Sequence, residues 1–198
     1  MAIPNSHWMD EGLELQRGDG GGAGTAPPPS PLEFKAVYEE EFDYVWDALR
    51  SLGIRERDLE DLTHDVFVKV FNRFATYDPT RPLRPWLFGV AFRVASDFRR
   101  LARHQHEAGS SLYDSPDHGT RPDDLAAARE ELRVVLLALD TLDIEHRAVF
   151  VMHEINDHSM REISENLDVP LSTLYDRLRL ARAEFSEAVR RLLKRDPA

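Results

Sequence analysis

Apolar side chains recur at steps of three and four residues along most of the chain, which is the spacing of one face of an α-helix. Between residues 32 and 104 this spacing predicts three helices, separated by Gly53 and by the proline-rich segment 77–85. Pro85 is expected at the first position of the third helix, from Trp86 to His104, with the arginines of that helix facing outward. The positions expected to face inward are Phe34, Val37, Tyr38, Phe42, Val45, Trp46, Leu49, Leu59, Leu62, Val66, Phe67, Val70, Leu87, Val90, Ala91, Val94 and Phe98.

The same helical spacing resumes at about Asp124 and continues almost to the end of the chain. Ser159 and Glu162 have the spacing of a capping box, which predicts a short helix starting there. The segment 168–170 should end this helix, because residues before a proline avoid the helical region, and Ser172 is a candidate cap for the last helix. Apolar positions in this half are Leu125, Leu132, Val135, Leu136, Leu139, Ile144, Ala148, Val149, Met152, Ile155, Met160, Ile163, Leu167, Leu174, Leu178, Ala181 and Phe185.

The last two predicted helices have the pattern of a helix-turn-helix. A short helix is followed by a tight turn and by a second helix whose outer face is polar and basic. In such motifs the second helix enters the major groove of DNA. An ordinary helical hairpin with solvated arginines has the same pattern. The outward positions of the second helix are Thr173, Tyr175, Asp176, Arg177, Arg179 and Arg182.

These elements predict an all-α protein with two helical domains. Residues 1–31 contain runs of glycine and proline with little to bury, which predicts a disordered extension. The first helical domain is expected at 32–106 and the second, ending in the helix-turn-helix, at 124–198. Residues 107–123 are rich in Ser, Asp, Gly and Pro, which is typical of a flexible linker.

The net charge of −11 is unusual for a protein that binds nucleic acid, because lysine and arginine supply most of that affinity. The charge is unevenly distributed, however. Residues 82–104 and residues 171–195 each carry a surplus of four positive charges, within an otherwise acidic chain. This distribution predicts contact with DNA at two separate places and weak binding in the absence of a partner that holds the chain there.

No pattern of an enzyme active site, a cofactor site or a metal site stands out. Cysteine is absent, and the glycines at 18–24 lack the lysine of a phosphate-binding loop. His104, His106, His153 and His158 lack acidic partners at helical spacing, so solvated or phosphate-proximal histidines explain them better than a metal site does. There is neither a signal-like N-terminus nor a run of eighteen apolar residues, so a cytoplasmic protein without membrane insertion is expected.

Several stretches, in order and at the right spacing over residues 33–190, resemble the extracytoplasmic-function group of bacterial RNA polymerase sigma factors. They are DLTHDVFVKVF at 61–71, YDP at 77–79 with WLFGVA at 86–91, SMREI at 159–163, VPLSTL at 169–174 and RLRLAR at 177–182. The resemblance implies a sigma factor that binds the β′ clamp and β flap of core RNA polymerase, recognises the minus-35 and minus-10 promoter elements and starts transcription. It also implies an anti-sigma protein as a partner.

The resemblance further implies roles for particular residues. Ser172, with the six outward positions of the last helix, would contact the minus-35 element. The polymerase contacts would be Asp61, Asp65, Lys69 and Asn72, although a solvated helix face with local ion pairs has the same pattern. The minus-10 contacts would be Asp78, Arg81, Arg84, Arg93, Arg99 and Arg100.

Some positions depart from the family pattern. Tyr175 and Asp176 stand where a lysine and a small polar residue are common, so promoter preference cannot be transferred from relatives. Two other hypotheses also fit the helical pattern. One is a helix-turn-helix regulator that acts without being a polymerase subunit, and the other is a protein-interaction module without promoter activity.

Overall fold

The computed structural model describes residues 31–74, 77–107 and 126–195, and all regular structure in these ranges is helical. The predicted N-terminal extension up to residue 30 and most of the predicted linker lie outside the described residues. The helices are α1 (Pro31–Ser51), α2 (Glu56–Arg73), α3 (Leu83–Glu107), α4 (Ala126–Leu139), α5 (Ile144–Phe150), the π-helical turn η2 (Val151–Ile155), α6 (Met160–Leu167) and α7 (Leu171–Arg195).

The first three helices pack against one another through the apolar faces that the sequence predicts. Gly53 closes the turn between α1 and α2 with a φ of +82°, a conformation that glycine adopts without steric cost. Leu49, Leu59 and Leu87, one from each helix, are fully buried. The helical prediction for this half of the chain is therefore confirmed.

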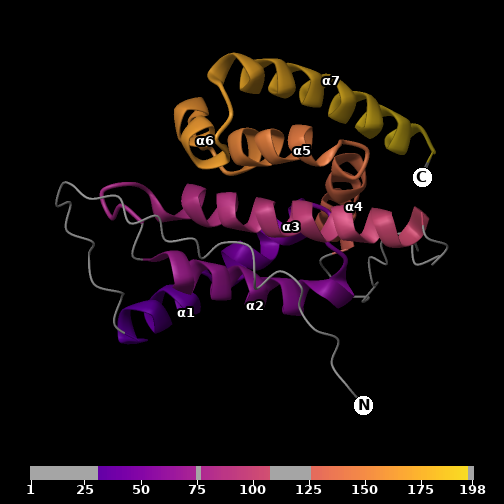
Figure 1. Ribbon diagram of the computed structural model, residues 1–198. Helices are drawn as coiled ribbons and strands as arrows, with labels where there is room; N and C mark the ends of the chain where they lie inside the picture. Colours follow the sequence, from indigo (N-terminus) through magenta and orange to yellow (C-terminus); the bar gives the residue numbers. More distant parts are fainter. Residues whose placement is uncertain (1–30, 75–76, 108–125, 196–198) are drawn as a thin grey trace.

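The second group of helices builds the helix-turn-helix. Helix α7 packs on α4, α5 and α6 through Leu174, Leu178 and Ala181, all of them buried. Figure 1 shows α7 on the outside of the molecule, on the side far from α1 and α2. One face of α7 is therefore left open along its length.

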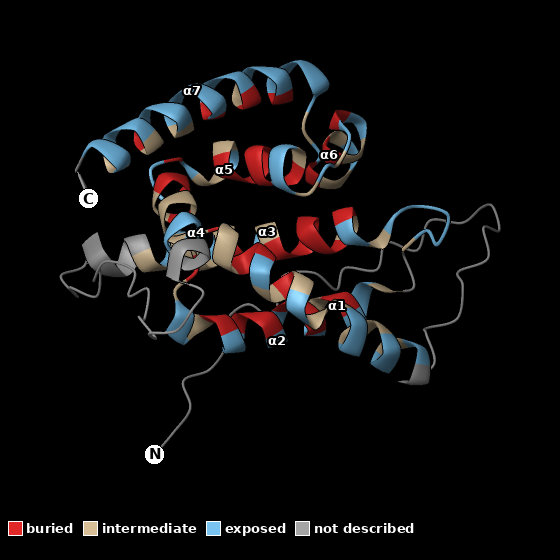
Figure 2. Ribbon diagram, turned by 180° about the vertical axis from the view of Figure 1, so that it is seen from behind, coloured by how far each residue is buried: buried red, intermediate tan, exposed pale blue. Residues whose placement is uncertain are grey.

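The two groups form one continuous hydrophobic core. Helix α6 packs directly against α3, so the short helix of the helix-turn-helix lies between α3 and the turn that leads to α7. Both α3 and α5 carry many buried residues, as Figure 2 shows. The two groups of helices are therefore packed against each other, an arrangement that we call closed. The sequence predicted two domains but gave no contact between them.

Some predicted boundaries are wrong. Pro85 is the third residue of α3, a position that tolerates proline because the first N–H groups of a helix have no intrahelical partner. Ser172 lies inside α7, which begins at Leu171, so it does not cap that helix.

Ile155 was predicted to face inward but is exposed, because η2 inserts a wider turn after α5 and rotates the following side chains. Leu132 is also exposed.

The predicted capping box at the start of α6 is present. The Ser159 hydroxyl accepts a hydrogen bond from the Glu162 N–H, and the Glu162 carboxylate accepts one from the Ser159 N–H at 2.8 Å. The Ser159 hydroxyl also donates to the Glu162 carboxylate at 2.7 Å, and this bond, together with the one from the Ser159 N–H, lowers the pKa of Glu162. Asp168 ends the helix in the left-handed conformation, with a φ of +57°. The helix is therefore fixed at both ends by its own sequence.

Ser159→Ala should lower the free energy of unfolding by about 1 kcal/mol, because it leaves an N-terminal donor of α6 without its cap. Urea denaturation followed by circular dichroism measures the change. Ser172→Ala is the matched control, since it removes a serine from the same motif that caps nothing, and it should change stability by less than about 0.5 kcal/mol. Equal losses for the two variants would contradict the capping role of Ser159.

Candidate nucleic-acid interface

The outer face of α7 carries the predicted minus-35 residues. Thr173, Tyr175, Asp176, Arg179 and Arg182 are exposed, as is Ser172, while Arg177 is half-buried. Among the predicted minus-35 residues, those at positions 172, 176 and 179 lie farthest from the buried stripe of α7, as the helical repeat requires. The structure therefore brings the predicted minus-35 residues together on one accessible helix.

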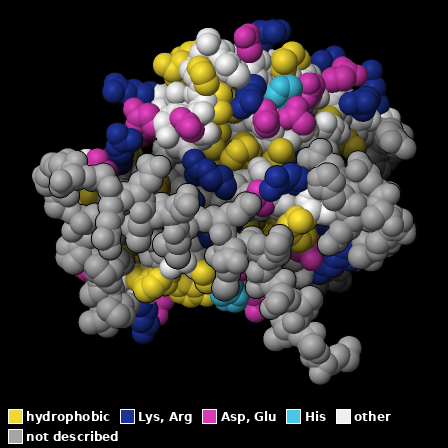
Figure 3. Space-filling model, in the orientation of Figure 1, with side chains coloured by type: hydrophobic (Ala, Val, Ile, Leu, Met, Phe, Trp, Pro, Cys, Tyr) yellow, Lys and Arg dark blue, Asp and Glu magenta, His cyan; other side chains and the backbone are white. Residues whose placement is uncertain are grey.

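The arginines of α7 differ in their surroundings. Arg177 makes an ion pair with Glu145 of α5, and Arg182 makes one with Glu154 of η2 at 2.6 Å. Both guanidinium groups therefore lie beside α7, toward α5 and η2, and not on its outermost face. Arg179 forms no ion pair with any residue in the described part of the chain and remains available on the outermost stripe. Lys and Arg side chains alternate with acidic ones over this end of the molecule (Figure 3).

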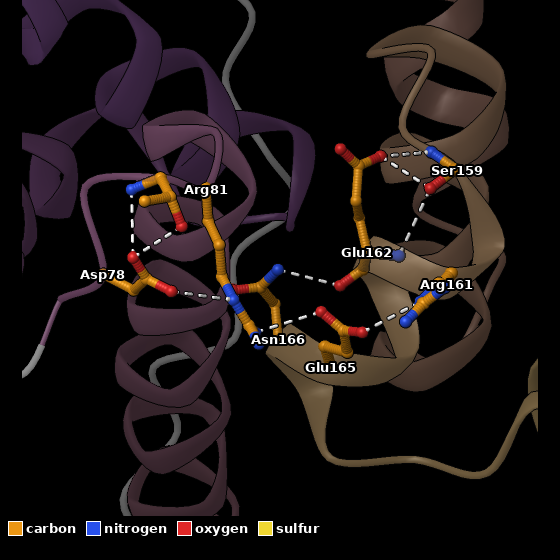
Figure 4. Close-up of polar contacts among 8 residues, drawn as sticks. Asp78, Arg81, Ser159, Arg161, Glu162, Glu165 and Asn166 are labelled. Carbon is orange, nitrogen blue, oxygen red and sulfur yellow. Dashed lines mark hydrogen bonds and ion pairs between the residues drawn. The ribbon is translucent and has the colours of Figure 1, made fainter.

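The loop before α3 is ordered by Asp78. Its carboxylate accepts hydrogen bonds from the Thr80 N–H at 3.0 Å and from the Thr80 hydroxyl at 2.7 Å, and these bonds lower the pKa of Asp78. Arg81 reaches from this loop to Glu165 of α6 at 3.0 Å while remaining 3.5 Å from Asp78 (Figure 4). A predicted minus-10 residue therefore bridges the two halves of the chain.

Two further minus-10 candidates are also engaged within the protein. Arg84 pairs with Glu41 at 2.9 Å and lies over the ring of Tyr44. Arg93 donates to the carbonyl oxygens of Gly89 and of Asn166 in α6, both at 3.0 Å. The side of α3 that was expected to meet promoter DNA is therefore partly covered by α6.

The last two minus-10 candidates, Arg99 and Arg100, do not contact α6. Arg99 is half-buried and donates to the carbonyl oxygen of Leu52 at 3.1 Å, so the expectation that the arginines of α3 face outward is wrong for this residue. Arg100 is exposed and pairs with Asp97 of the same helix at 3.3 Å. The six minus-10 candidates consequently do not form one continuous surface in this closed arrangement.

Trp86 is half-buried at the start of α3, with its ring 5.0 Å from that of Tyr77 and 6.4 Å from that of Phe74 between centroids. This position beneath the 77–85 loop supports a packing role for the indole.

Glycine 89 allows the close approach of α6 to α3. A Cβ atom at this position would lie 2.8 Å from the carbonyl oxygen of Asn166, well inside van der Waals contact. An isolated glycine within a helical pattern is a signal of such a close approach of another backbone. At the far end of the junction, the buried Arg147 of α5 packs over Gly53 and donates to Asp140 at 2.9 Å.

Tyr44 marks a third contact between the two halves. Its hydroxyl lies 3.3 Å from His158 Nε2 and accepts a hydrogen bond from the Asn156 side chain at 3.4 Å. Burial raises the pKa of Tyr44, and burial is also the main cause of the lowered pKa of His158. Glu162 and Asp157 oppose the shift of His158, while Arg84 adds to it. A neutral imidazole is therefore favoured in the closed arrangement.

The predicted polymerase-binding residues lie on the outer face of α2. Asp61, Asp65 and Asn72 are exposed, whereas Lys69 is half-buried at the edge, 3.9 Å from Asp97. Asp61 and Asp65 make no ion pair with the residues that the structure describes, so of the charged residues on this face only Lys69 has an ion-pair partner there. Val68, which the sequence did not single out, lies among them with 59% of its surface exposed.

No helix in the described ranges is long and apolar enough to cross a membrane. Within the same ranges, no group of three or more histidine or acidic side chains is arranged to hold a metal ion. The side chains of His104 and His106 lie outside the described part. His153 contacts the carbonyl oxygen of His158 through Nδ1 at 3.0 Å, within the turn before α6.

Comparison with known families identifies both halves. Residues 37–105 match sigma-70 region 2, and residues 132–185 match sigma-70 region 4. These two regions define a sigma factor of the sigma-70 class, a non-catalytic subunit that directs RNA polymerase to promoters.

Similarity to individual proteins shows to which group of sigma factors the chain belongs. The chain is 32% identical to the RNA polymerase sigma factor CnrH of Cupriavidus metallidurans over 151 residues, which cover 70% of this chain and 77% of CnrH. It is 31% identical to the extracytoplasmic-function sigma factor SigL of Mycobacterium tuberculosis over 149 residues, which cover 74% of this chain and 83% of SigL. The chain therefore belongs to the extracytoplasmic-function group of RNA polymerase sigma factors.

Solved structures agree in fold. CnrH in complex with the cytosolic domain of CnrY matches with a TM-score of 0.60 and 27% identity, over 85% of this chain and 92% of that one. The sigma factor RpoE of Bartonella quintana, in complex with the anti-sigma factor NepR, matches with a TM-score of 0.65 and 19% identity, over 80% of this chain and 97% of that one. The matches to sigma-70 regions 2 and 4 and to the curated sigma factors confirm the sigma-factor hypothesis over a regulator that acts without the polymerase.

Gly89→Ala should shift the chain toward an open form, in which α6 is separated from α3. Alanine is intrinsically better than glycine within α3 by about 1 kcal/mol, but its Cβ would collide with Asn166 in the closed form. Energy transfer between dyes on cysteines introduced by Glu40→Cys and Glu187→Cys measures the change cleanly, because the chain has no native cysteine. The transfer efficiency should fall in this variant. It should stay at the parent value in the control Arg100→Ala, on the same helix but away from α6, and a fall in both would contradict the steric explanation.

Acid should also favour the open form. Because burial lowers the pKa of His158 in the closed form, the open form binds the proton more readily. Closure should be unaffected by pH above about 6.5, the ordinary value for histidine, and should weaken as the pH falls below it. The same dye pair, followed from pH 8 to pH 5.5, should lose transfer. His158→Gln should abolish this dependence, and its persistence would assign the effect to other groups.

Proposed function

We propose that α7 reads the minus-35 element, that α3 and the preceding loop contact the minus-10 element, and that the outer face of α2 binds the β′ clamp. The observation that carries this proposal is the separation of the three surfaces. The outer face of α7 is open on one side of the molecule and the acidic face of α2 is open on the other, and α3 lies between these two helices (Figure 1).

Helix α7 is suited to the major groove. It follows the short helix α6 after a tight turn, and its polar residues from Ser172 to Arg182 are held outward by the buried stripe beneath them. Arg179 is the strongest candidate for a base contact because it is exposed and lies at the outermost position. Arg177 and Arg182, which already bind carboxylates on the flanks, are better placed for phosphates.

The minus-10 role requires the closed arrangement to open. The two elements lie 25 base pairs apart by their names, which is about 85 Å of duplex at about 3.4 Å per base pair. A compact chain of this length is only about 40 Å across. Separation of α6 from α3 would both extend the chain and release Arg81 and Arg93 from Glu165 and Asn166.

The partners follow from these surfaces. Core RNA polymerase would hold the first half through Asp61, Asp65, Val68 and Asn72, and the second half through the β flap. An anti-sigma protein is a further proposed partner, because the Bartonella RpoE was solved with the anti-sigma factor NepR and CnrH was solved with the cytosolic domain of CnrY. A chain that acts with the polymerase would work in the cytoplasm.

Transcription in vitro tests this function directly. Core polymerase supplemented with the chain should start RNA synthesis at defined promoters, whereas core polymerase alone should not. DNase footprints of the complex should cover both elements. Specific initiation without protection of the minus-35 element would contradict the role of α7.

Asp65→Ala should weaken the binding of core polymerase by about fivefold or more, because it removes a charge from the centre of the proposed contact face. Glu60→Ala is the matched control, since it removes one acidic residue from another side of the same helix. Affinity is measured with labelled chain titrated by core polymerase, and circular dichroism verifies the fold. Similar affinities for the two variants would move the contact away from Asp65.

A further inference from the structure

The outermost stripe of α7 carries an acidic residue where DNA recognition favours basic ones. Asp176 is exposed and lies on the side of α7 opposite the buried Leu174, Leu178 and Ala181. It makes no ion pair with any described residue of the chain. Its carboxylate is therefore neither neutralised by the protein nor needed for the packing of the motif.

A carboxylate at this position is unfavourable for general DNA binding. It repels the phosphates, and the nearby guanidinium groups of Arg177 and Arg182 are turned away toward Glu145 and Glu154. The cost is offset only where the carboxylate accepts a hydrogen bond from a base. Asp176 consequently acts as a sequence filter if α7 enters the groove.

The chemistry of the groove selects the base. Two bases offer an amino group in the major groove, cytosine through N4 and adenine through N6. Adenine also presents N7 beside its amino group, and the lone pair of N7 repels a carboxylate. Cytosine presents no acceptor at that edge. We propose that Asp176 selects cytosine at one position of the minus-35 element by accepting a hydrogen bond from the N4 amino group.

This inference rests on the proposed reading of the minus-35 element by α7. Arg179 supports it, because it lies on the same stripe three residues later, about 4.5 Å along the helix axis. Its guanidinium suits the O6 and N7 acceptors of guanine. The selected cytosine should therefore lie within one or two base pairs of a guanine contacted by Arg179.

Selection from a promoter library tests the inference. Core polymerase with the full-length chain binds promoters that are randomised over twelve base pairs centred on the minus-35 position, and the bound fraction is sequenced. The wild-type chain should enrich cytosine at one position by about fivefold over the other bases. Asp176→Ala should lose this preference at that position alone. Asp176→Asn should prefer adenine there, because an amide pairs with both N6 and N7.

Glu187→Gln is the matched control, since it also removes one negative charge from the exposed surface of α7, eleven residues farther along. It should leave the selected sequence unchanged. Retention of the cytosine preference in Asp176→Ala, with the rest of the selected sequence intact, would overturn the inference alone. Failure of the wild-type chain to select any sequence in the window would overturn the inference together with the proposed role of α7. Circular dichroism of each variant confirms that the comparison is made on folded protein.

Discussion

The packing of α6 against α3 at Gly89 is the contact on which the closed arrangement depends. Without a side chain at this position, the backbone of α6 approaches closely enough for Arg93 to donate to the Asn166 carbonyl. The same approach brings Glu165 to Arg81, as the close-up shows (Figure 4), and places His158 against Tyr44. Apolar burial is continuous across this junction, so one close backbone contact couples the two halves of the chain.

Under the proposed minus-10 role, arginines that make internal contacts in the closed form would bind DNA in an open one. In the closed form, Arg81, Arg84 and Arg93 bind carboxylates and carbonyl oxygens of the protein. Phosphate oxygens offer these groups equivalent acceptors with a full negative charge. Opening would therefore exchange the bonds of Arg81 to Glu165 and of Arg93 to Asn166 for the proposed contacts with DNA, and any partner that binds only the open form would shift the equilibrium toward it. The polymerase would supply that bias by holding the two halves apart.

The surplus of negative charge limits what α7 does alone. A chain with a net charge of −11 is repelled from DNA at long range, so under the proposed role the arginines of α7 would act only after another molecule brings them to the promoter. Acidic residues even reach the flanks of the recognition helix, where Glu145 and Glu154 hold two of its arginines. Under these conditions discrimination among bases matters more than general affinity, which agrees with an unpaired carboxylate on the outermost stripe.

The sequence by itself determined the helices, the capping box at Ser159 and the outward residues of α7, because these features depend on spacing within one segment of the chain. Exposure of Asp61, Asp65 and Asn72 followed from the same periodicity. The tertiary structure alone decided that Arg99 turns inward to Leu52, that Glu165 and Asn166 meet the arginines before and within α3, and that Arg147 is buried over Gly53. These contacts join residues that are far apart along the chain. Helical periodicity gives the face on which each side chain lies but carries no information about which distant face packs against it.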